Sequence, residues 1–506
     1  MLWFLICVAI LLLGYFLYSK VVEKIFVINP KRETPAHTLK DGVDYVPMSK
    51  KKIWLIQLLN IAGTGPIFGP ILGALYGPVA MLWIVFGCVF AGAVHDYFSG
   101  MLSIRNGGAN IPYMAGKYLG RPAKHVMNIF AILLLLLVGV VFVASPASLL
   151  TNITSDLMNS GSVGAAAVND EAGAAKGNIL MIWTAIIFVY YIIATLVPID
   201  KIIGRIYPIF GALLMFMTLG MLFGLFFEGI PFFQTITAKL GHEVELADFF
   251  TNLHPKEGTP LWPLLFVTIA CGAISGFHAT QSPLMARCTE NEKEGRFIFY
   301  GAMIGEGVIA LIWCMVGLSF YDDQASLVEA LKGTPSKVVY DSAIGMLGLF
   351  GGILAVLGVV VLPITSGDTA FRAARLLIAD YLKIDQRNIA KRLSIAIPLF
   401  AIGYWVSTVD FQVLWRYFGW ANQTTAMVML WTASAYLFRH KKFHWVTTIP
   451  AIFMTMVCAS YIANAPIGFN MSYDTSLWAG VAATVVAVIA FFTLLKPMTP
   501  EEQDND

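Results

Sequence analysis

The chain has 506 residues, of which 58% are hydrophobic and only 13% are charged. Soluble proteins carry about 25% charged residues, so this composition excludes a soluble globular protein and indicates a polytopic membrane protein. The formal net charge of +2 gives no sign of a nucleic-acid partner. The six cysteines lie in or beside apolar segments without metal-ligand spacing, so we expect neither a metal site nor a disulfide framework.

Apolar segments long enough to cross a bilayer recur along the whole chain. The first has no basic residue before it and no small-residue cleavage site after it, which favours a retained helix over a signal peptide. The fold expected is therefore an all-α polytopic membrane protein. The expected spans, 13 in total, are 2–18, 53–76, 78–103, 122–145, 178–198, 204–227, 260–288, 297–320, 346–367, 393–409, 413–437, 445–463 and 476–495.

The Lys and Arg residues predict the orientation of these spans. If residue 1 lies outside, 27 of the 33 Lys and Arg residues fall in inside loops and 6 fall outside. Loops on the cytoplasmic side of a membrane carry an excess of basic residues. We therefore expect the N-terminus outside and the C-terminus in the cytoplasm.

Two of the apolar segments are interrupted by residues that do not continue a regular helix. The first interruption is NIAGTGPIFGP, residues 60–70, and the second is CGAISGFHATQSP, residues 271–283. Proline lacks the N–H and clashes with the preceding turn, and glycine leaves the backbone unconstrained. Lipid cannot satisfy free backbone groups, so a break survives only inside protein or beside a wet cavity. For either break alone, a proline kink in a structural helix is the alternative.

A pair of broken helices in corresponding places of two halves is typical of secondary transporters. The predicted topology gives two five-helix units of opposite orientation, each opening with a broken helix. We expect both breaks, over residues 62–66 and 274–280, to be non-helical and to face each other near the middle of the bilayer. The expected divisions are an extra helix at 1–20, a basic cytoplasmic loop at 21–52, repeats at 53–227 and 260–440 separated by an extracytoplasmic loop at 228–259, two further helices at 441–496 and an acidic tail at 497–506.

The segments NIAGTGPIFGPILGALYGP, HDYFSGMLSIRNGG, SGFHATQSP, EGVIALIW and TSGDTAFRAARL together resemble the carbon starvation protein A family. The resemblance runs from about residue 50 to 440. It implies a bacterial inner-membrane secondary transporter that is induced when carbon is scarce and that takes up peptides or pyruvate with proton coupling. The five-plus-five inverted repeat similarly resembles the fold of the amino acid–polyamine–cation superfamily.

Helix ends at the two breaks offer free N–H groups and positive dipole ends to a carboxylate. We therefore expect a small carboxylate-bearing substrate, peptide or pyruvate, to bind there, with no other cofactor. The residues predicted to bind substrate are Asn60, Gly63, Thr64, Gly65 and Pro66 in the first break, and Ser275, Gly276, Phe277, His278 and Gln281 in the second.

Ionisable residues inside a bilayer are functional candidates by default. Glu306 lies between Gly305 and Gly307, which permit close helix approach, and burial favours its protonated form. Asp96 can carry a proton or pair with Arg105 or Arg372. In the run ITSGDTAFRAAR, Arg372 can supply a charge near Asp368. The superfamily resemblance implies a sodium site at Thr365 and Ser366, so sodium coupling stays open beside proton coupling through Glu306, Asp96, Asp368 or His278.

Structural roles are the alternatives for these residues, because each carboxylate can simply bond a neighbouring helix. For the whole protein the alternatives are a channel, a membrane sensor without transport and an intramembrane enzyme. No HExxH, GxSxG or paired-carboxylate signature supports the enzyme, and no P-loop supports the use of ATP. The sequence leaves the oligomeric state open.

Overall fold

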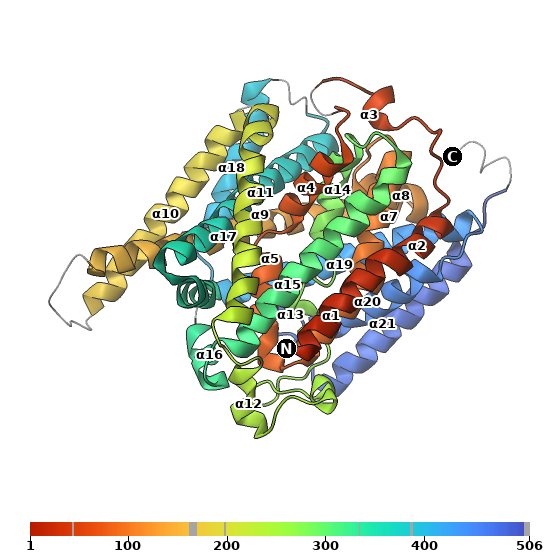
Figure 1. Cartoon of the computed structure of the whole chain (residues 1–506). Coiled ribbons are helices and arrows are strands. Elements are labelled where there is room, and N and C mark those ends of the chain that lie inside the picture. Colours follow the sequence, from red (N-terminus) through yellow and green to blue (C-terminus); the bar gives the residue numbers. More distant parts are fainter. Residues whose placement is uncertain (43–44, 161–169, 197–198, 333, 385–387, 500–506) are drawn as a thin grey trace. The chain divides into compact units, whose positions relative to one another are not determined.

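The described part of the chain is built from helices, apart from one isolated bridge between Met48 and Thr289. This confirms the all-α prediction. The computed structural model describes residues 1–42, 45–160, 170–196, 199–332, 334–384 and 388–499 (Figure 1).

Ten helices in the described ranges are long and apolar enough to cross a membrane, and one bent helix pair adds an eleventh. The predicted number of 13 exceeds this count by two. One difference is the second broken segment, whose helices α13 (Leu264–Thr268) and α14 (Gly276–Ala286) are short. The other is α19 (Phe411–Arg439), which has 29 residues but carries the polar run Asn422, Gln423, Thr424 and Thr425.

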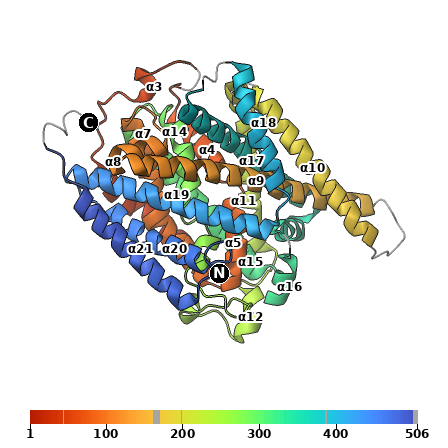
Figure 2. The same cartoon turned by 180° about the vertical axis from the view of Figure 1, so that it is seen from behind.

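The chain folds into two compact units, which are described separately. The first unit contains Met1–Leu134, Glu245–Cys314 and Arg416–Asp506. In it, α20 and α21 lie side by side (Figures 1 and 2). Its elements are α1 (Leu2–Leu13), η1 (Gly14–Tyr18), α2 (Ser19–Phe26), α3 (Pro35–Thr38), α4 (Lys50–Ile61), α5 (Gly65–Gly73), η2 (Ala74–Tyr76), α6 (Val79–Leu82), η3 (Trp83–Gly92), α7 (Ala93–Arg105), α8 (Ile111–Leu119), the start of α9 (Arg121–Ser160), η4 (Leu246–Phe250), α13, α14, η5 (Glu292–Glu294), η6 (Arg296–Tyr300), most of α15 (Gly301–Ser319), most of α19, α20 (Trp445–Asn464) and α21 (Tyr473–Leu494).

The second unit contains Leu135–Val244 and Met315–Trp415. Within it, α11 packs along α17, which bends at Gly348, a residue with a φ of 66°. Each predicted repeat supplies helices to both units, and the repeat boundaries stay a prediction. The elements of this unit are the remainder of α9, α10 (Asp170–Leu196), α11 (Ile199–Phe227), α12 (Gln234–Leu240), α16 (Gln324–Ala330), α17 (Ser336–Leu382) and α18 (Ile389–Val406).

The first break separates α4 from α5, and the axis bends there by 50°. Only residues 62–64 are non-helical, because Gly65 and Pro66 already form the first turn of α5. Proline is well placed in a first turn, since the N–H it lacks would have no partner there. The predicted break is confirmed, but it is shorter than the expected range of 62–66.

The second break covers residues 269–275, between α13 and α14. The expected range of 274–280 is wrong, because Gly276, Phe277 and His278 form the first turn of α14. The break lies earlier in the chain than expected, and it includes Gly272. This glycine has a φ of +86°, a left-handed value that interrupts a right-handed helix. His278 therefore lies at the start of a helix and not inside the break.

The two breaks pack directly against each other, as predicted from the sequence. A Cβ atom built on Gly65 would lie 2.5 Å from the Sγ of Cys271, and one built on Gly272 would lie 3.8 Å from the Cβ of Pro66. Glycine at position 65 thus lets the start of α5 approach the second break. The position of this contact in the thickness of a membrane stays a prediction.

We expect Gly65→Ala to lower the free energy of unfolding by about 1–3 kcal/mol, since the new methyl group must displace Cys271. We expect Gly65→Leu to abolish transport as well. Thermal unfolding of the detergent-purified protein measures the first effect, and Cys271→Gly should partly reverse it. Gly177→Ala is the control, because a Cβ at Gly177 meets open space. A Gly65→Ala protein as stable as the parent would show that the breaks are not in close contact.

Candidate functional site

Four ionisable side chains form a continuous chain beside the second break. Asp96 on α7 lies between two histidines: its Oδ1 is 2.8 Å from Nδ1 of His95, and its Oδ2 is 2.8 Å from Nδ1 of His278. On the other side of the His278 ring, Nε2 lies 3.3 Å from Oε2 of Glu306 on α15. All four side chains are fully buried. We call this chain of His95, Asp96, His278 and Glu306 the buried relay.

The partners of Asp96 determine where the histidine protons lie. An ionised carboxylate only accepts hydrogen bonds, so each histidine donates from Nδ1 to Asp96. His278 then turns Nε2 toward Glu306. A bare Nε2 and a bare carboxylate oxygen would repel each other, so the contact requires a proton on at least one of the two groups. That proton sits either on His278, as an imidazolium facing a carboxylate, or on Glu306, as a carboxylic acid facing a neutral imidazole.

Close packing of helices holds Glu306 against the relay. Its neighbours Gly305 and Gly307 lie against Leu58 and Cys88: built Cβ atoms would be 3.4 Å from Leu58 Cδ1 and 2.7 Å from Cys88 Sγ. This confirms the close helix approach expected from the two glycines. Neither carboxylate oxygen has a hydrogen bond of good geometry within the described residues. The contact with His278 is thus an electrostatic one at 3.3 Å.

The helix that carries Asp96 follows a ten-residue π-helical segment, η3. π-Helical turns are rare and often lie at functional sites. At the end of η3, a Cβ on Gly92 would lie 2.3 Å from the carbonyl oxygen of Ala273 in the second break. Glycine at this position therefore lets the backbone reach the break, and α7 begins directly beside it.

Asn422 of α19 connects the backbone on both sides of the second break. Its Oδ1 accepts hydrogen bonds from the backbone N–H of Phe277, at 2.8 Å, and from Oγ of Ser275, at 3.2 Å. Its Nδ2 donates to the carbonyl oxygen of Ala270 at 3.1 Å. One amide side chain thus satisfies a free donor at the start of α14 and a free acceptor at the start of the break.

Two further side chains satisfy carbonyl groups around the same break. Nε1 of Trp83 donates to the carbonyl oxygen of Ile269 at 3.2 Å, and Nε2 of Gln423 donates to that of Phe266 at 2.7 Å. Backbone groups that a regular helix would pair internally are therefore paired with side chains of η3 and α19. This is the condition under which a broken helix persists in hydrocarbon.

The structure brings together most of the residues that the sequence singled out at the breaks. Asn60, Thr64, Ser275, His278 and Gln281 are all buried within the first unit, around the contact between the breaks. Five other predicted residues form the backbone of the first break and of the first turns of α5 and α14: Gly63, Gly65, Pro66, Gly276 and Phe277. Whether any of them binds a substrate stays a prediction.

Of the two alternatives for Asp96, the pairing with an arginine is wrong, because two histidines occupy both of its oxygens. Arg105 instead pairs with the buried Glu292, with Nε–Oε1 and Nη2–Oε2 distances of 3.1 and 3.0 Å. This bidentate ion pair ties the end of α7 to the start of the span that carries Glu306. It supports the relay from a distance and takes no part in it.

The other coupling candidates lie on α17, in the second unit. Arg372 Nη2 is 3.5 Å from Asp368 Oδ2, which confirms the expected charge near Asp368. Thr365 donates its hydroxyl to the carbonyl oxygen of Leu362 in its own helix, at 2.9 Å. Thr365 and Ser366 as cation ligands stay a prediction. Among the residues that the structure describes, no group of three His, Cys, Asp or Glu side chains is arranged to hold a metal ion.

Sequence reasoning missed several buried polar residues around the site. Gln57, Ser99 and Asn422 are fully buried, and Gln57 and Ser99 have no hydrogen-bond partner among the described residues. Each is a polar residue inside an apolar segment, and that signal was available. His95 was noticed only as a neighbour of Asp96, although its ring completes the relay.

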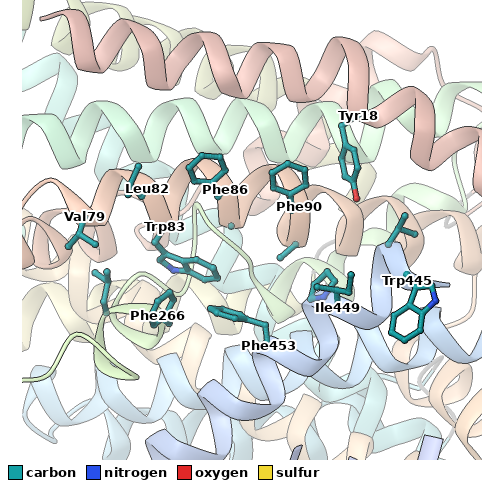
Figure 3. Close-up of a pocket in the computed structure, with 15 residues that line it drawn as sticks. Tyr18, Val79, Leu82, Trp83, Phe86, Phe90, Phe266, Trp445, Ile449 and Phe453 are labelled. Atoms are coloured by element: carbon teal, nitrogen blue, oxygen red, sulfur yellow. The ribbon is translucent and has the colours of Figure 1, made fainter. Parts of the chain in front are cut away.

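A separate apolar pocket of about 470 Å³ lies in the first unit (Figure 3). The rings of Trp83, Phe266 and Phe453 lie together in it, and Phe86 and Phe90 line one side. Of the residues that the structure describes, no acid, base or amide side chain lines the pocket, so a charged nutrient would have no partner among them. We therefore place the candidate functional site at the buried relay and not in this pocket.

Sequence relatives support a transporter. The sequence model described as "Carbon starvation protein CstA" matches residues 1–168, 157–348 and 334–460. A Haemophilus influenzae protein named "Uncharacterized membrane protein" is 64% identical over 66% of this chain and 94% of its own length. The Escherichia coli "Peptide transporter CstA" is 25% identical over 92% of this chain and 82% of its own. The Escherichia coli "Pyruvate/proton symporter BtsT" is 30% identical over 62% of this chain and 48% of its own.

Solved structures of transporters share the fold. MhsT, crystallised in complex with L-phenylalanine, has a TM-score of 0.57 and 13% identity, over 81% of this chain and 99% of its own. The nucleobase-cation-symport-1 family transporter Mhp1 has a TM-score of 0.53 and 14% identity, over 94% of this chain and 99% of its own. Both are inverted-repeat transporters, which confirms the predicted fold class.

We expect Asn422→Leu to destabilise the protein by about 3 kcal/mol, because it removes three buried hydrogen bonds and leaves Phe277 N–H and Ala270 C=O unpaired. Thermal unfolding in detergent measures this loss. Thr425→Val on the same helix is the matched control, since the hydroxyl of Thr425 bonds the Ala421 carbonyl of its own helix, at 2.9 Å, and no group of the second break. Equal stability of the two variants would contradict the role given to Asn422.

Proposed function

Because this chain belongs to the carbon starvation protein CstA family, we propose that it imports a small carboxylate-bearing nutrient, either a peptide or pyruvate, by proton-coupled secondary transport. The chain is a multi-pass membrane transporter by its family and its fold. Its substrate, coupling ion and orientation are the proposed part. We place it in the bacterial inner membrane, with the N-terminus outside, on the distribution of Lys and Arg.

The observation that carries this proposal is the buried contact of 3.3 Å between His278 Nε2 and Glu306 Oε2, two groups that can exchange a proton. With Asp96 and Glu306 ionised and His278 doubly protonated, the relay bears a net charge of −1. One further proton, on Glu306 or on Nε2 of His95, makes it neutral. A buried net charge is costly, so binding and release of that proton change the free energy of the occluded state.

The place of the relay suggests how proton movement acts on the substrate. His278 occupies the first turn of α14, next to the second break, and the break touches the first one at Gly65. A change of charge at His278 therefore acts directly on the helix ends to which a substrate carboxylate would bind. In alternating access, this couples the loading of the proton to the geometry of the breaks.

Counterflow in proteoliposomes tests the function. Vesicles containing the purified protein are loaded with unlabelled dipeptide or pyruvate and exposed to the labelled compound, with an imposed proton or sodium gradient. Transient accumulation that follows the proton gradient supports the proposal. A sodium requirement without proton movement would move the coupling to Thr365 and Ser366. Single-channel currents would indicate a channel, and saturable binding without flux would indicate a sensor.

The orientation is testable separately with single-cysteine variants of a cysteine-free protein. A cysteine at Lys51 should react with a membrane-impermeant maleimide only after the cells are opened. A cysteine at Lys256 should react in intact cells. The opposite pattern would reverse the proposed orientation.

We expect Glu306→Gln to keep counterflow exchange and to lose proton-driven accumulation by at least tenfold. Glutamine resembles the protonated acid in shape and can donate to His278 Nε2, but it cannot release a proton. Uptake with and without an imposed pH gradient separates the two activities. Glu329→Gln is the matched control, because Glu329 lies on α16 with an exposed side chain. Full proton-driven accumulation by Glu306→Gln would move the role to Asp96, Asp368 or His278.

A further inference from the structure

Three buried polar side chains, on helices that pack together at the relay, have no hydrogen-bond partner for at least one of their polar atoms within the described ranges. They are Gln57 on α4, Ser99 on α7 and Gln281 on α14. All are fully buried. An unpaired polar atom in a protein interior costs about 1–3 kcal/mol, so three from three different helices indicate a site that something else completes.

The helix register places two of these residues next to each other. Asp96 and His278 touch, and just past the ends of the same two helices Nε of Arg287 donates to the carbonyl oxygen of Gly108 at 3.1 Å. The helices α7 and α14 therefore run parallel from their contact at the relay. Residues three positions apart share a helix face, so Ser99 and Gln281 form the next pair after Asp96 and His278.

Gln57, the third residue, lies on α4, which runs in the opposite direction to α14. Helix α4 packs against α14. Its start is joined to the end of α14 by the hydrogen bond from Met48 N to Cys288 O, at 3.1 Å, and the break after it touches Cys271. The two helices are thus antiparallel. A rise of about 1.5 Å per residue brings Gln57 to roughly the level of His278 and Gln281.

The hydrogen-bond pattern determines which atom of Gln281 is unpaired. The hydroxyl of Thr280 donates its only proton to the carbonyl oxygen of Phe277, at 2.6 Å. It can then only accept, so Gln281 turns its amide nitrogen toward it, at 3.1 Å. The amide oxygen of Gln281 is left without a donor. A flipped amide would place two acceptors against each other, which excludes that arrangement.

The unpaired groups indicate which hydrogen-bonding groups a bound ligand must carry. Gln281 offers an acceptor, Gln57 offers both a donor and an acceptor, and the Ser99 hydroxyl serves as either. A compound with N–H groups, such as the ammonium or amide of a peptide, satisfies the two amide oxygens. Pyruvate carries only acceptors and would leave them unpaired.

We propose that Gln57, Ser99 and Gln281 form a subsite for the N–H groups of the substrate, and that this transporter prefers a short peptide to pyruvate. This inference rests on the proposed transport function, which it narrows to one substrate class. A site built to hydrogen-bond a substrate N–H rejects strongly an analogue that lacks it, because its own buried groups are then left unpaired.

Isothermal titration calorimetry of the full-length protein in detergent tests the subsite, with dialanine and pyruvate as the two probes. The variants are Gln57→Met and Gln281→Met, which keep side-chain length and remove the amide. Gln324→Met is the matched control, since Gln324 is a buried glutamine of α16 that bonds Lys239. Thermal unfolding of each variant identifies any that fails to fold, and the two site variants provide independent tests.

We expect dialanine to bind at least tenfold more tightly than pyruvate. Each site variant should weaken dialanine binding about tenfold and leave pyruvate binding unchanged, whereas Gln324→Met should change neither. Pyruvate binding as tight as dialanine binding would overturn the inference, as would folded Gln57→Met and Gln281→Met proteins with the parent's affinity for dialanine. Dialanine that binds as expected but does not cross proteoliposomes would refute the proposed transport and leave the subsite standing.

Discussion

The need to satisfy every backbone polar group without water governs this structure. Breaking a membrane helix releases N–H and C=O groups that hydrocarbon cannot pair. At the second break, side chains pair these groups. Asn422 bonds backbone groups on both sides, and Trp83 and Gln423 bond two further carbonyls. Side chains therefore support the break, and its neighbours α7, η3 and α19 are positioned by the hydrogen bonds and close contacts they make with it.

The buried relay depends on the same support. Asp96 holds two histidines through Nδ1, and this leaves Nε2 of His278 to face Glu306. The His278 ring is held on one side by a hydrogen bond of 2.8 Å to Asp96 and faces Glu306 on the other side at 3.3 Å. The glycines at 92, 305 and 307 make this possible, because bulkier residues would keep the helices apart. Packing and proton chemistry are thus parts of one arrangement.

The buried relay and the proposed subsite of Gln57, Ser99 and Gln281 differ in their hydrogen-bonding groups. At the relay, every strong donor is directed at a carboxylate. One turn further along α7 and α14, the unpaired atoms are neutral amides and a hydroxyl. The neutral groups suit the N–H groups proposed for the substrate, whose carboxylate is proposed to bind at the helix ends of the breaks. The separate apolar pocket in Figure 3 offers neither.

Composition and the glycine and proline content of residues 60–70 and 271–283 were enough to predict a helical membrane protein with two broken helices, because these are local properties of the chain. Local properties did not place the second break correctly, since Gly272 and the bonds of Asn422 decide where α14 begins. They also suggested arginine partners for Asp96. Only the tertiary structure showed that residues 95, 96, 278 and 306 form one relay and that the helices of Gln57 and Ser99 pack against the helix of His278. Such pairings join side chains up to about 200 positions apart, and periodicity within one segment carries no information about which face of another helix it will meet.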